Sequence, residues 1–311
     1  MMKFTLFGVP TSAGTHGIGQ DKAPMQLRRA GLVDRLSEAG VDIEDDGDLP
    51  LALYRSGSQD RLQQNLDLVT TVARRVADRI EQVARRGRVP VVLGGDCTVT
   101  IGAVAGLQRL HPDLGLMYFD GDVDLDTPSS TRSGILDEMG VAILLGDGAR
   151  ELTHLGPRHP MLTAERLALF GFNQPRLPTT EMERLAASGV SAWPVDEIAG
   201  QPQQVAAEAW AKLALTAGPI LVHFDVDAID STDLPLANYP HFNIGQSFDS
   251  AMTCLTTFCG SRQFAGLVLT EVNPDHDADG SHLRRLIDGI VASLREASFG
   301  PATIRFKAED R

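Results

Sequence analysis

The sequence predicts an α/β fold with a central, mainly parallel sheet, and two observations support this fold class. Short apolar runs of strand length alternate with longer amphipathic segments, which is the pattern of strands and helices around a parallel sheet. The short runs are almost continuously hydrophobic, which indicates that helices cover both faces of the sheet. A chain of 311 residues can form one large core, so we expect a single domain over residues 1–311.

The alternation sets the expected order of elements along the chain. The apolar runs predict strands at Lys3–Phe7, Val89–Leu93, Gly115–Phe119, Leu167–Phe172, Ile220–Phe224 and Gly266–Thr270. The amphipathic segments predict helices at Ala23–Ala39, Arg61–Arg86, Thr98–Leu110, Glu181–Ser188, Gln204–Thr216 and His282–Ala297. Pro24 suits the first turn of its helix, where no helical hydrogen bond is lost. The Gly-, Pro- and His-rich stretch Gly146–Pro160 is expected to be a loop.

Composition excludes several classes of function. The net charge of −13 argues against a nucleic-acid partner, because such binding depends on Lys and Arg neutralising phosphates. No apolar stretch approaches the roughly 20 residues of a membrane span, and the first ten residues lack the apolar region of a signal peptide. The three cysteines form no CxxC pair, so a disulfide framework is not expected. A cytoplasmic protein without a membrane partner is therefore expected.

Acidic residues follow three of the expected strands. The first segment is Gly94-Gly95-Asp96-Cys97, where two glycines permit a tight turn and a close backbone approach. The second is Asp120-Gly121-Asp122-Val123-Asp124, and the third is His223-Phe224-Asp225-Val226-Asp227. Ligands gather at the carboxyl ends of parallel strands, so these segments are expected to meet.

The alternation of Asp residues within these segments predicts convergence. Side chains of an extended segment repeat every two residues, so Asp120, Asp122 and Asp124 can point to one side, as can Asp225 and Asp227. Five carboxylates packed together cost several kcal/mol unless they are protonated or bind cations. Oxygen ligands favour Mg, Ca or Mn, and a thiolate favours Zn or Fe. Taken singly, each segment is also compatible with a solvated loop or a structural cation site.

These motifs resemble those of the ureohydrolases, the family of arginase and agmatinase, over nearly the whole chain. Near the start, Gly8-Val9-Pro10 and the segment Ala23–Leu32 resemble the family's opening loop and first helix, and Asp46–Pro50 matches a stretch typical of arginases. The metal motifs follow in order: Gly94–Cys97, Asp120–Asp124, Asp225–Asp230 and Glu271-Val272-Asn273-Pro274. The resemblance implies a three-layer αβα fold of the arginase type.

The resemblance also implies a two-metal site. The implied metal ligands are Cys97, Asp120, Asp122, Asp124, Asp225 and Asp227. Asp120 and Asp225 would bridge two ions, Asp124 would complete one site and Asp227 the other, and a hydroxide held between the ions would attack a guanidinium carbon. Two manganese ions are the cofactor implied, with zinc, iron or no metal as alternatives. The family commonly forms trimers and hexamers, so a homo-oligomer is expected.

Further roles follow from the same resemblance. The implied catalytic residues are Asp124, Asp137 and Glu271, with Glu271 gripping the substrate guanidinium and Asp137 at the position of a proton-shuttle histidine. The implied substrate-contacting residues are Asp126, Thr131, Ser133, Glu181, His241 and Glu271. His16 lies in the Gly-rich opening loop, where the family builds part of the site mouth.

The sequence departs from the family within the site itself. Cys97 and Asp122 replace two metal-binding histidines, and Asp126 replaces an asparagine. Four Asp, two divalent ions and a hydroxide sum to roughly −1, whereas adding Asp122 and a Cys97 thiolate gives about −3, which weakens the metals as Lewis acids. A small cationic guanidino substrate more activated than arginine, such as an N-hydroxylated arginine, is therefore expected.

Two other hypotheses remain open on the sequence alone. The chain can be a non-catalytic relative that uses the fold for binding or as a partner subunit. Alternatively, Cys97 can act as a nucleophile on an amidine carbon without metal, with His223 or His241 as base, although its acidic surroundings disfavour a thiolate. Cys254 and Cys259 lie five residues apart on a segment expected to be helical, and both are expected to be core residues.

Overall fold

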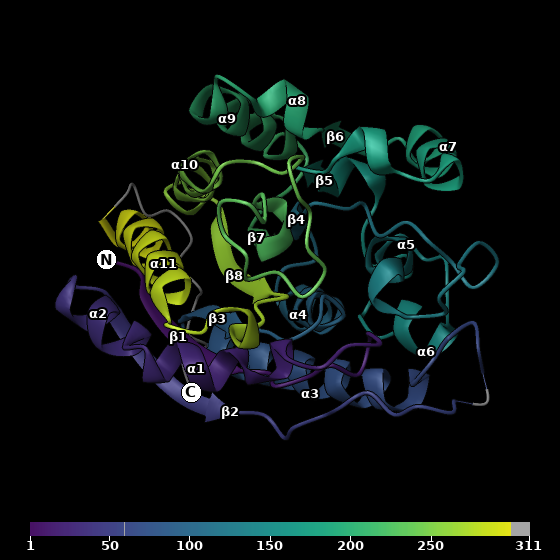
Figure 1. The fold of residues 1–311 in the computed structure, drawn as a ribbon, viewed down its shortest axis with the longest axis horizontal. Helices are drawn as coiled ribbons and strands as arrows, with labels where there is room; N and C mark the ends of the chain where they lie inside the picture. The colour runs from purple at the N-terminus through teal and green to yellow at the C-terminus, as the bar shows by residue number, and fades with distance from the viewer. Residues whose placement is uncertain (59, 300–311) are drawn as a thin grey trace.

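The computed structural model describes residues 1–58 and 60–299, and its centre is one sheet of eight strands (Figure 1). The strands are β1 (Lys3–Gly8), β2 (Asp42–Asp48), β3 (Val89–Leu93), β4 (Gly115–Phe119), β5 (Leu167–Phe170), β6 (Ser191–Trp193), β7 (Ile220–Asp225) and β8 (Phe264–Thr270). Their order across the sheet is β2-β1-β3-β8-β7-β4-β5-β6, and every pairing is parallel. The predicted α/β class is confirmed.

The six predicted strands are all present: two match the predicted bounds, and the other four differ at one end by one or two residues. Two further strands, β2 and β6, were not predicted, and they form the two edges of the sheet. β2 is the acidic segment Asp42–Asp48, and its residues are half-buried or exposed. An edge strand has a neighbour on one side only, so it can be polar, and an apolar run no longer marks it.

Helices flank the sheet on both faces. They are α1 (Ala23–Arg29), α2 (Leu32–Glu38), α3 (Leu66–Arg85), α4 (Val99–Gln108), α5 (Gly140–Leu144), α6 (Arg150–Thr153), α7 (Thr179–Ser188), α8 (Val195–Ile198), α9 (Pro202–Leu213), α10 (Phe248–Cys259) and α11 (Ser281–Phe299). In Figure 1, α3 and α4 lie on one side of the central strands, and α9, α10 and α11 lie on the other. The three-layer αβα arrangement is therefore as predicted.

Two helix predictions were wrong in detail. The helix predicted at Ala23–Ala39 is two helices, because Gly31 adopts a left-handed conformation with φ of 92° and ends the first one. The helix predicted from Arg61 begins only at Leu66. The stretch Gly146–Pro160, predicted as a loop, contains the single-turn helix α6. Among the described residues, no helix combines the length and apolar character needed to cross a membrane.

The close packing of α3 against α4 fixes the position of Cys97. Every residue of α4 is buried, and a Cβ on Gly102 would lie 2.4 Å from the carbonyl oxygen of Ala73 in α3, so glycine is required at this contact. The turn before α4 is equally tight, since a Cβ on Gly95 would lie 1.8 Å from the Thr11 carbonyl oxygen. Cys97 is thereby held at the end of β3.

The carboxyl ends of four neighbouring strands meet at one edge of the sheet. In register, Leu93 of β3 lies beside Leu269 of β8, Asp225 of β7 lies beside Thr270 of β8, and Phe119 of β4 lies beside Phe224. The acidic segments that follow these strands are therefore side by side, as the sequence predicts.

Candidate metal and substrate site

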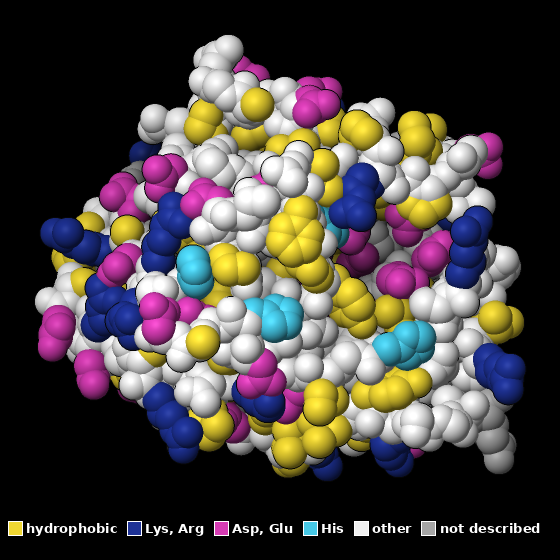
Figure 2. Space-filling view, in the orientation of Figure 1, with side chains coloured by type: hydrophobic (Ala, Val, Ile, Leu, Met, Phe, Trp, Pro, Cys, Tyr) yellow, Lys and Arg dark blue, Asp and Glu magenta, His cyan; other side chains and the backbone are white. Residues whose placement is uncertain are grey.

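A cavity of about 380 Å³ opens at this edge of the sheet. Its lining includes all six residues implied as metal ligands, namely Cys97, Asp120, Asp122, Asp124, Asp225 and Asp227. Asp137, His241 and Glu271 also line it. Figure 2 shows the hollow, with acidic side chains in its depth and hydrophobic, basic and histidine side chains around its rim. The tertiary structure thus brings together residues from distant parts of the chain.

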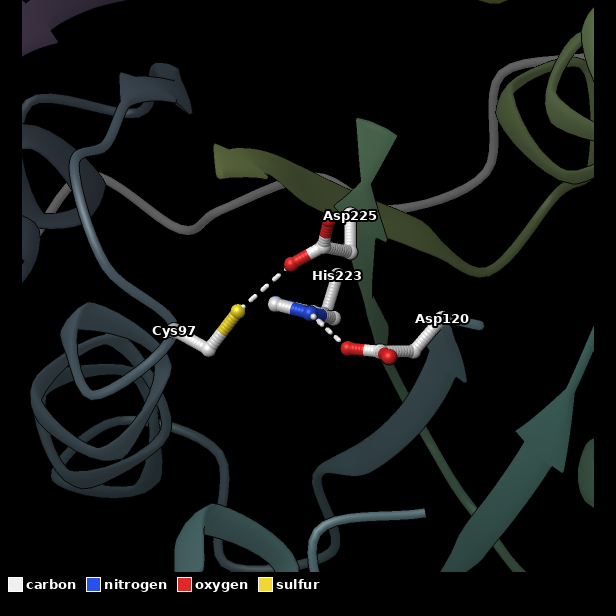
Figure 3. A group of neighbouring side chains, drawn as sticks. All are labelled: Cys97, Asp120, His223 and Asp225. Atoms are coloured by element: carbon white, nitrogen blue, oxygen red, sulfur yellow. Dashed lines mark hydrogen bonds and ion pairs between the residues drawn. The ribbon is translucent and has the colours of Figure 1, made fainter. Parts of the chain in front are cut away.

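One group of side chains forms what we call the inner cluster: Cys97, Asp120, His223 and Asp225 (Figure 3). All four are buried, and one potential ligand atom from each lies within 4.8 Å of the others. The Cys97 Sγ is 2.7 Å from Asp225 Oδ2, and His223 Nε2 is 3.2 Å from Asp120 Oδ2. Thiol, imidazole and carboxylate groups in this arrangement can hold a divalent ion.

A second group, the outer cluster, consists of Asp122, Asp227 and His241. His241 Nε2 lies 3.2 Å from Asp122 Oδ2 and 3.8 Å from Asp227 Oδ2. Burial opposes protonation of His241, but its hydrogen bond to Asp122 and the charge of Asp227 outweigh this and raise its pKa to about 9. In the absence of a metal, an imidazolium at this point neutralises part of the acidic charge.

Glu271 lines the cavity, and its carboxylate has no hydrogen-bond partner in the part of the chain that the structure describes. Both of its carboxylate oxygens are buried and unpaired among the described residues, which is costly unless a ligand pairs with them. Its backbone has φ of 58°, a strained conformation for a residue other than glycine. One of its oxygens lies within 4.8 Å of the Cys97 sulfur and of an Asp137 oxygen. A buried, unpaired carboxylate suits a cationic ligand group.

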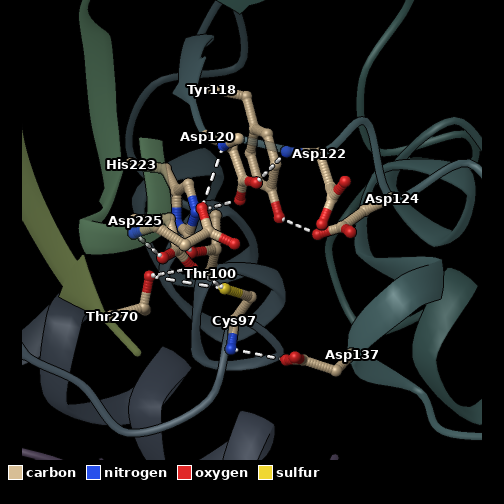
Figure 4. Close-up of polar contacts among 12 residues, drawn as sticks. Cys97, Thr100, Tyr118, Asp120, Asp122, Asp124, Asp137, His223, Asp225 and Thr270 are labelled. Atoms are coloured by element: carbon tan, nitrogen blue, oxygen red, sulfur yellow. Dashed lines mark hydrogen bonds and ion pairs between the residues drawn. The ribbon is translucent and has the colours of Figure 1, made fainter. Parts of the chain in front are cut away.

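Asp124 is turned toward a tyrosine instead of toward the clusters. The Tyr118 hydroxyl donates a hydrogen bond to Asp124 Oδ2, and Asp124 belongs to neither cluster (Figure 4). The Tyr118 ring also stacks on the imidazole of His223, with centroids 4.0 Å apart. Asp124 has φ of 47°, so its backbone is also strained. Its implied role as a metal ligand stays a prediction.

Burial destabilises the ionised forms of the carboxyl groups and of the thiol in this site. Burial, followed by the charge of Asp227, raises the pKa of Asp120 and of Asp225 well above the usual carboxylate range. Burial, followed by the charge of Asp225, also raises the pKa of the Cys97 thiol. A cation would relieve these costs, so the donor set fits metal ions. A thiol with a raised pKa is a poor nucleophile, which disfavours the metal-free mechanism.

Four residues implied to contact the substrate lie outside the cavity lining: Asp126, Thr131, Ser133 and Glu181. The first three make local hydrogen bonds: Ser130 Oγ lies 2.7 Å from Asp126 Oδ1, Thr131 Oγ1 lies 3.3 Å from Ser133 Oγ, and Ser133 donates to Glu138. Burial, with the charge of Asp126, raises the pKa of Glu181 to about 8. His16 is exposed and packs edge-on against the Tyr54 ring. Their roles in binding remain predictions.

The structure also adds residues that the sequence reasoning did not assign to the site. Ile135, Glu138, Arg176, Tyr239 and Pro240 complete the cavity lining. The sequence reasoning considered His223 only as a base, although its spacing from Asp225 indicated that it lies beside the metal ligands. It precedes Asp225 by two residues on the same strand, so both side chains point to the same face.

Comparisons with known proteins agree with this geometry. Residues 2–305 match the model of the family described as "Arginase family". The arginase of Bacillus caldovelox is 29% identical over 305 residues, covering 96% of this chain and 99% of that protein. Arginase-1 of Homo sapiens is 27% identical, covering 96% of this chain and 92% of that protein. The solved structure of arginase from Bacillus cereus is 26% identical, with a TM-score of 0.85 and coverage of 98% and 100% of the two chains.

The match of the family model over nearly the whole chain agrees with the motifs at the ends of β3, β4, β7 and β8. The fold and the order of those motifs along the chain lead to the same conclusion. The chain belongs to the arginase family.

Proposed function

We propose that the protein is a metal-dependent hydrolase that cleaves a guanidino C–N bond of an arginine-like or modified arginine substrate, releasing urea or a substituted urea. The observation that carries this proposal is the buried, unpaired carboxylate of Glu271 in a cavity lined by candidate metal ligands. A guanidinium group matches a carboxylate in charge and in bidentate geometry. The relatives named arginase give the reaction class.

The inner and outer clusters would hold the metal ions. Asp120 and Asp225 on the inner side, and Asp122 and Asp227 on the outer side, supply carboxylate oxygens, and Cys97 supplies a thiolate. Bound divalent ions would lower the pKa of water enough to provide a nucleophile at neutral pH. Manganese is the ion that the family resemblance implies, and the thiol of Cys97 makes zinc or iron the alternatives.

Glu271 and Asp137 would act on the substrate itself. Glu271 would bind the guanidinium and hold its central carbon facing the clusters, since both of its oxygens are free. Asp137 accepts a hydrogen bond of 2.7 Å from the backbone N–H of Cys97, which fixes its carboxylate within 4.8 Å of Glu271. From this position, Asp137 would transfer a proton to the departing amine.

The charge of the site favours a modified substrate. Asp122 and Cys97 add negative charge near the ions, which reduces their power to polarise a poor electrophile such as the guanidinium of free arginine. An N-hydroxylated arginine requires less activation. Arg176 also lines the cavity, and a carboxylate at the other end of the substrate would be attracted to it.

The experiment is a urea-release assay with the metal-loaded protein on arginine, N-hydroxyarginine and agmatine. We expect turnover of the modified arginine to exceed that of arginine at least tenfold, because ions that are weaker Lewis acids slow the hydrolysis of the less activated substrate more. Turnover of arginine at ordinary enzymatic rates would contradict the choice of substrate. Urea release that persists after complete chelation would contradict the metal-dependent mechanism.

One observation favours a second candidate, a non-catalytic binding protein. Asp124 is held by Tyr118, so one implied metal ligand is already engaged. A binding protein would take up guanidino compounds, measured by calorimetry, without releasing urea from any of them. We also propose a homo-oligomer, a trimer or hexamer, which light scattering of the purified protein would test.

A further inference from the structure

The inner cluster differs from an all-oxygen metal site because it combines a thiol and an imidazole with two carboxylates. We propose that it is a zinc-class metal site whose four ligands are Cys97, Asp120, His223 and Asp225, with His223 supplying the donor that the family resemblance assigns to Asp124. This inference deepens the proposed function, because it concerns the same cavity. Metal ligation can nevertheless be measured without any turnover.

The distances in the inner cluster suit one ion. Zinc binds sulfur at about 2.3 Å and nitrogen or oxygen at about 2.0–2.2 Å, so its tetrahedral ligands lie roughly 3.3–3.8 Å apart. His223 Nε2 and Asp120 Oδ2 are already 3.2 Å apart. The Cys97 thiol and Asp225 Oδ2 are hydrogen-bonded with Sγ and Oδ2 2.7 Å apart, and an ion bound between these two atoms would replace this contact.

The surroundings of His223 orient its ring for ligation. Its Nδ1 lies 2.7 Å from the Thr100 hydroxyl on α4, and its ring is parallel to Tyr118 within 6°. A hydroxyl can donate or accept, so Thr100 can accept a hydrogen bond from Nδ1–H while Nε2 presents its lone pair to the ion. Metal-binding histidines typically have such an outer hydrogen bond, which fixes the tautomer and the ring plane.

Tyr118 contacts both His223, the ligand added here, and Asp124, the ligand that it replaces. Its ring supports the imidazole of His223 from one face, while its hydroxyl engages Asp124 Oδ2. A competing ligand set, Cys97 with Asp137 and Glu271, offers three donors instead of four and contains no imidazole. The contacts therefore favour the set that contains His223.

The donor types decide the class of metal. A thiolate and an imidazole bind zinc, cobalt(II) or iron(II) better than manganese, which prefers oxygen ligands. On binding, the S–H bond of Cys97 breaks, the proton is released to solvent, and a metal–sulfur bond forms. We therefore expect one ion per chain in the inner cluster that manganese does not displace.

The test uses the full-length protein, stripped of metal by chelation and reloaded with cobalt(II) or zinc. Cobalt bound to a thiolate gives a charge-transfer absorption band, which we expect in the parent protein and not in Cys97→Ala. His223→Gln should weaken zinc binding at least tenfold, and Thr100→Val about tenfold through loss of the outer hydrogen bond. Matched controls are Cys254→Ser in the α10 core and His154→Gln, which is exposed outside the cavity. Both should leave zinc affinity and the cobalt band unchanged.

A second measurement covers the case in which His223→Gln does not fold. X-ray absorption of the zinc-loaded His241→Gln variant should show one sulfur at about 2.3 Å and an imidazole, which must then come from His223. Absence of the sulfur or of the imidazole would overturn the inference. Cobalt binding without a thiolate band would do so as well.

The results of these experiments can support or contradict the zinc site independently of the proposed hydrolase activity. A protein with the cobalt–thiolate band that hydrolyses no guanidino compound would keep this inference and lose the proposed function. A manganese-dependent hydrolase without the band would keep the function and lose the inference.

Discussion

The inner and outer clusters share one cavity but are built differently. In the inner cluster, His223 and Asp225 belong to β7, Asp120 directly follows β4, and Cys97 is held by the packing of α4, so all four side chains are buried. In the outer cluster, Asp122 and His241 lie on loops, and the Asp122 side chain is 46% exposed. The sheet therefore fixes the geometry of the inner cluster, whereas the outer cluster is built on loops and is partly exposed to solvent. The inner cluster should tolerate substitution least.

Asp225→Asn should have the largest effect, because Asp225 connects the two clusters. Its Oδ2 contacts Cys97 and Thr270, and its Oδ1 accepts the backbone N–H of Asp227 at 2.8 Å. We expect metal affinity and urea release both to fall on the order of 100-fold or more. Metal analysis after dialysis and the urea assay measure this, with the exposed Asp288→Asn as control. Full metal content in Asp225→Asn would refute the assignment.

Glu271→Gln should separate substrate binding from metal binding. The amide keeps the shape of the side chain but loses the charge that pairs with a guanidinium, a loss of about 2 kcal/mol or more, or roughly 30-fold in kcat/KM. Metal content should stay at the parent level, because Glu271 belongs to neither cluster. If the substitution instead removed metal and left KM unchanged, Glu271 would be a ligand and not a substrate contact.

His241→Gln should sharpen the contrast between the clusters. Because the Asp122 side chain is 46% exposed, losing the imidazole should weaken binding of the outer ion alone, by about tenfold, and leave the inner ion in place. Titration with zinc or manganese, followed by calorimetry, would resolve the two sites. Equal weakening of both ions would show that the clusters act as one unit, and the contrast drawn above would fail.

Glu181→Gln should leave metal binding unchanged and should instead alter how the free energy of unfolding depends on pH. The pKa of Glu181 is raised to about 8 by burial and by Asp126, so the folded state binds its proton more tightly than the unfolded chain does. Glu181 therefore makes the parent lose stability as pH rises from about 4.5 to 8, and the glutamine variant lacks this contribution. Thermal unfolding should show that the free energy of unfolding of the variant, relative to that of the parent, is higher at pH 8 than at pH 5 by on the order of 2 kcal/mol. A pH-independent difference would contradict the raised pKa.

The central strands and the acidic segments after them could be predicted from the sequence. Buried parallel strands require apolar runs, and these runs marked β1, β3, β4, β5, β7 and β8. The family motifs then gave the order in which acidic residues reach the cavity. The edge strands β2 and β6 were not predictable in this way, because one open edge relaxes the need for apolar residues.

The sequence by itself determined the fold class, the family and the set of side chains that meet at one edge of the sheet, because these depend on patterns repeated along the chain. Only the tertiary structure decided how those side chains pair. The stacking of Tyr118 on His223, the diversion of Asp124 and the unpaired oxygens of Glu271 depend on distances between segments far apart in the chain. Such distances are set by packing between β3, β4, β7 and β8, which no local pattern records.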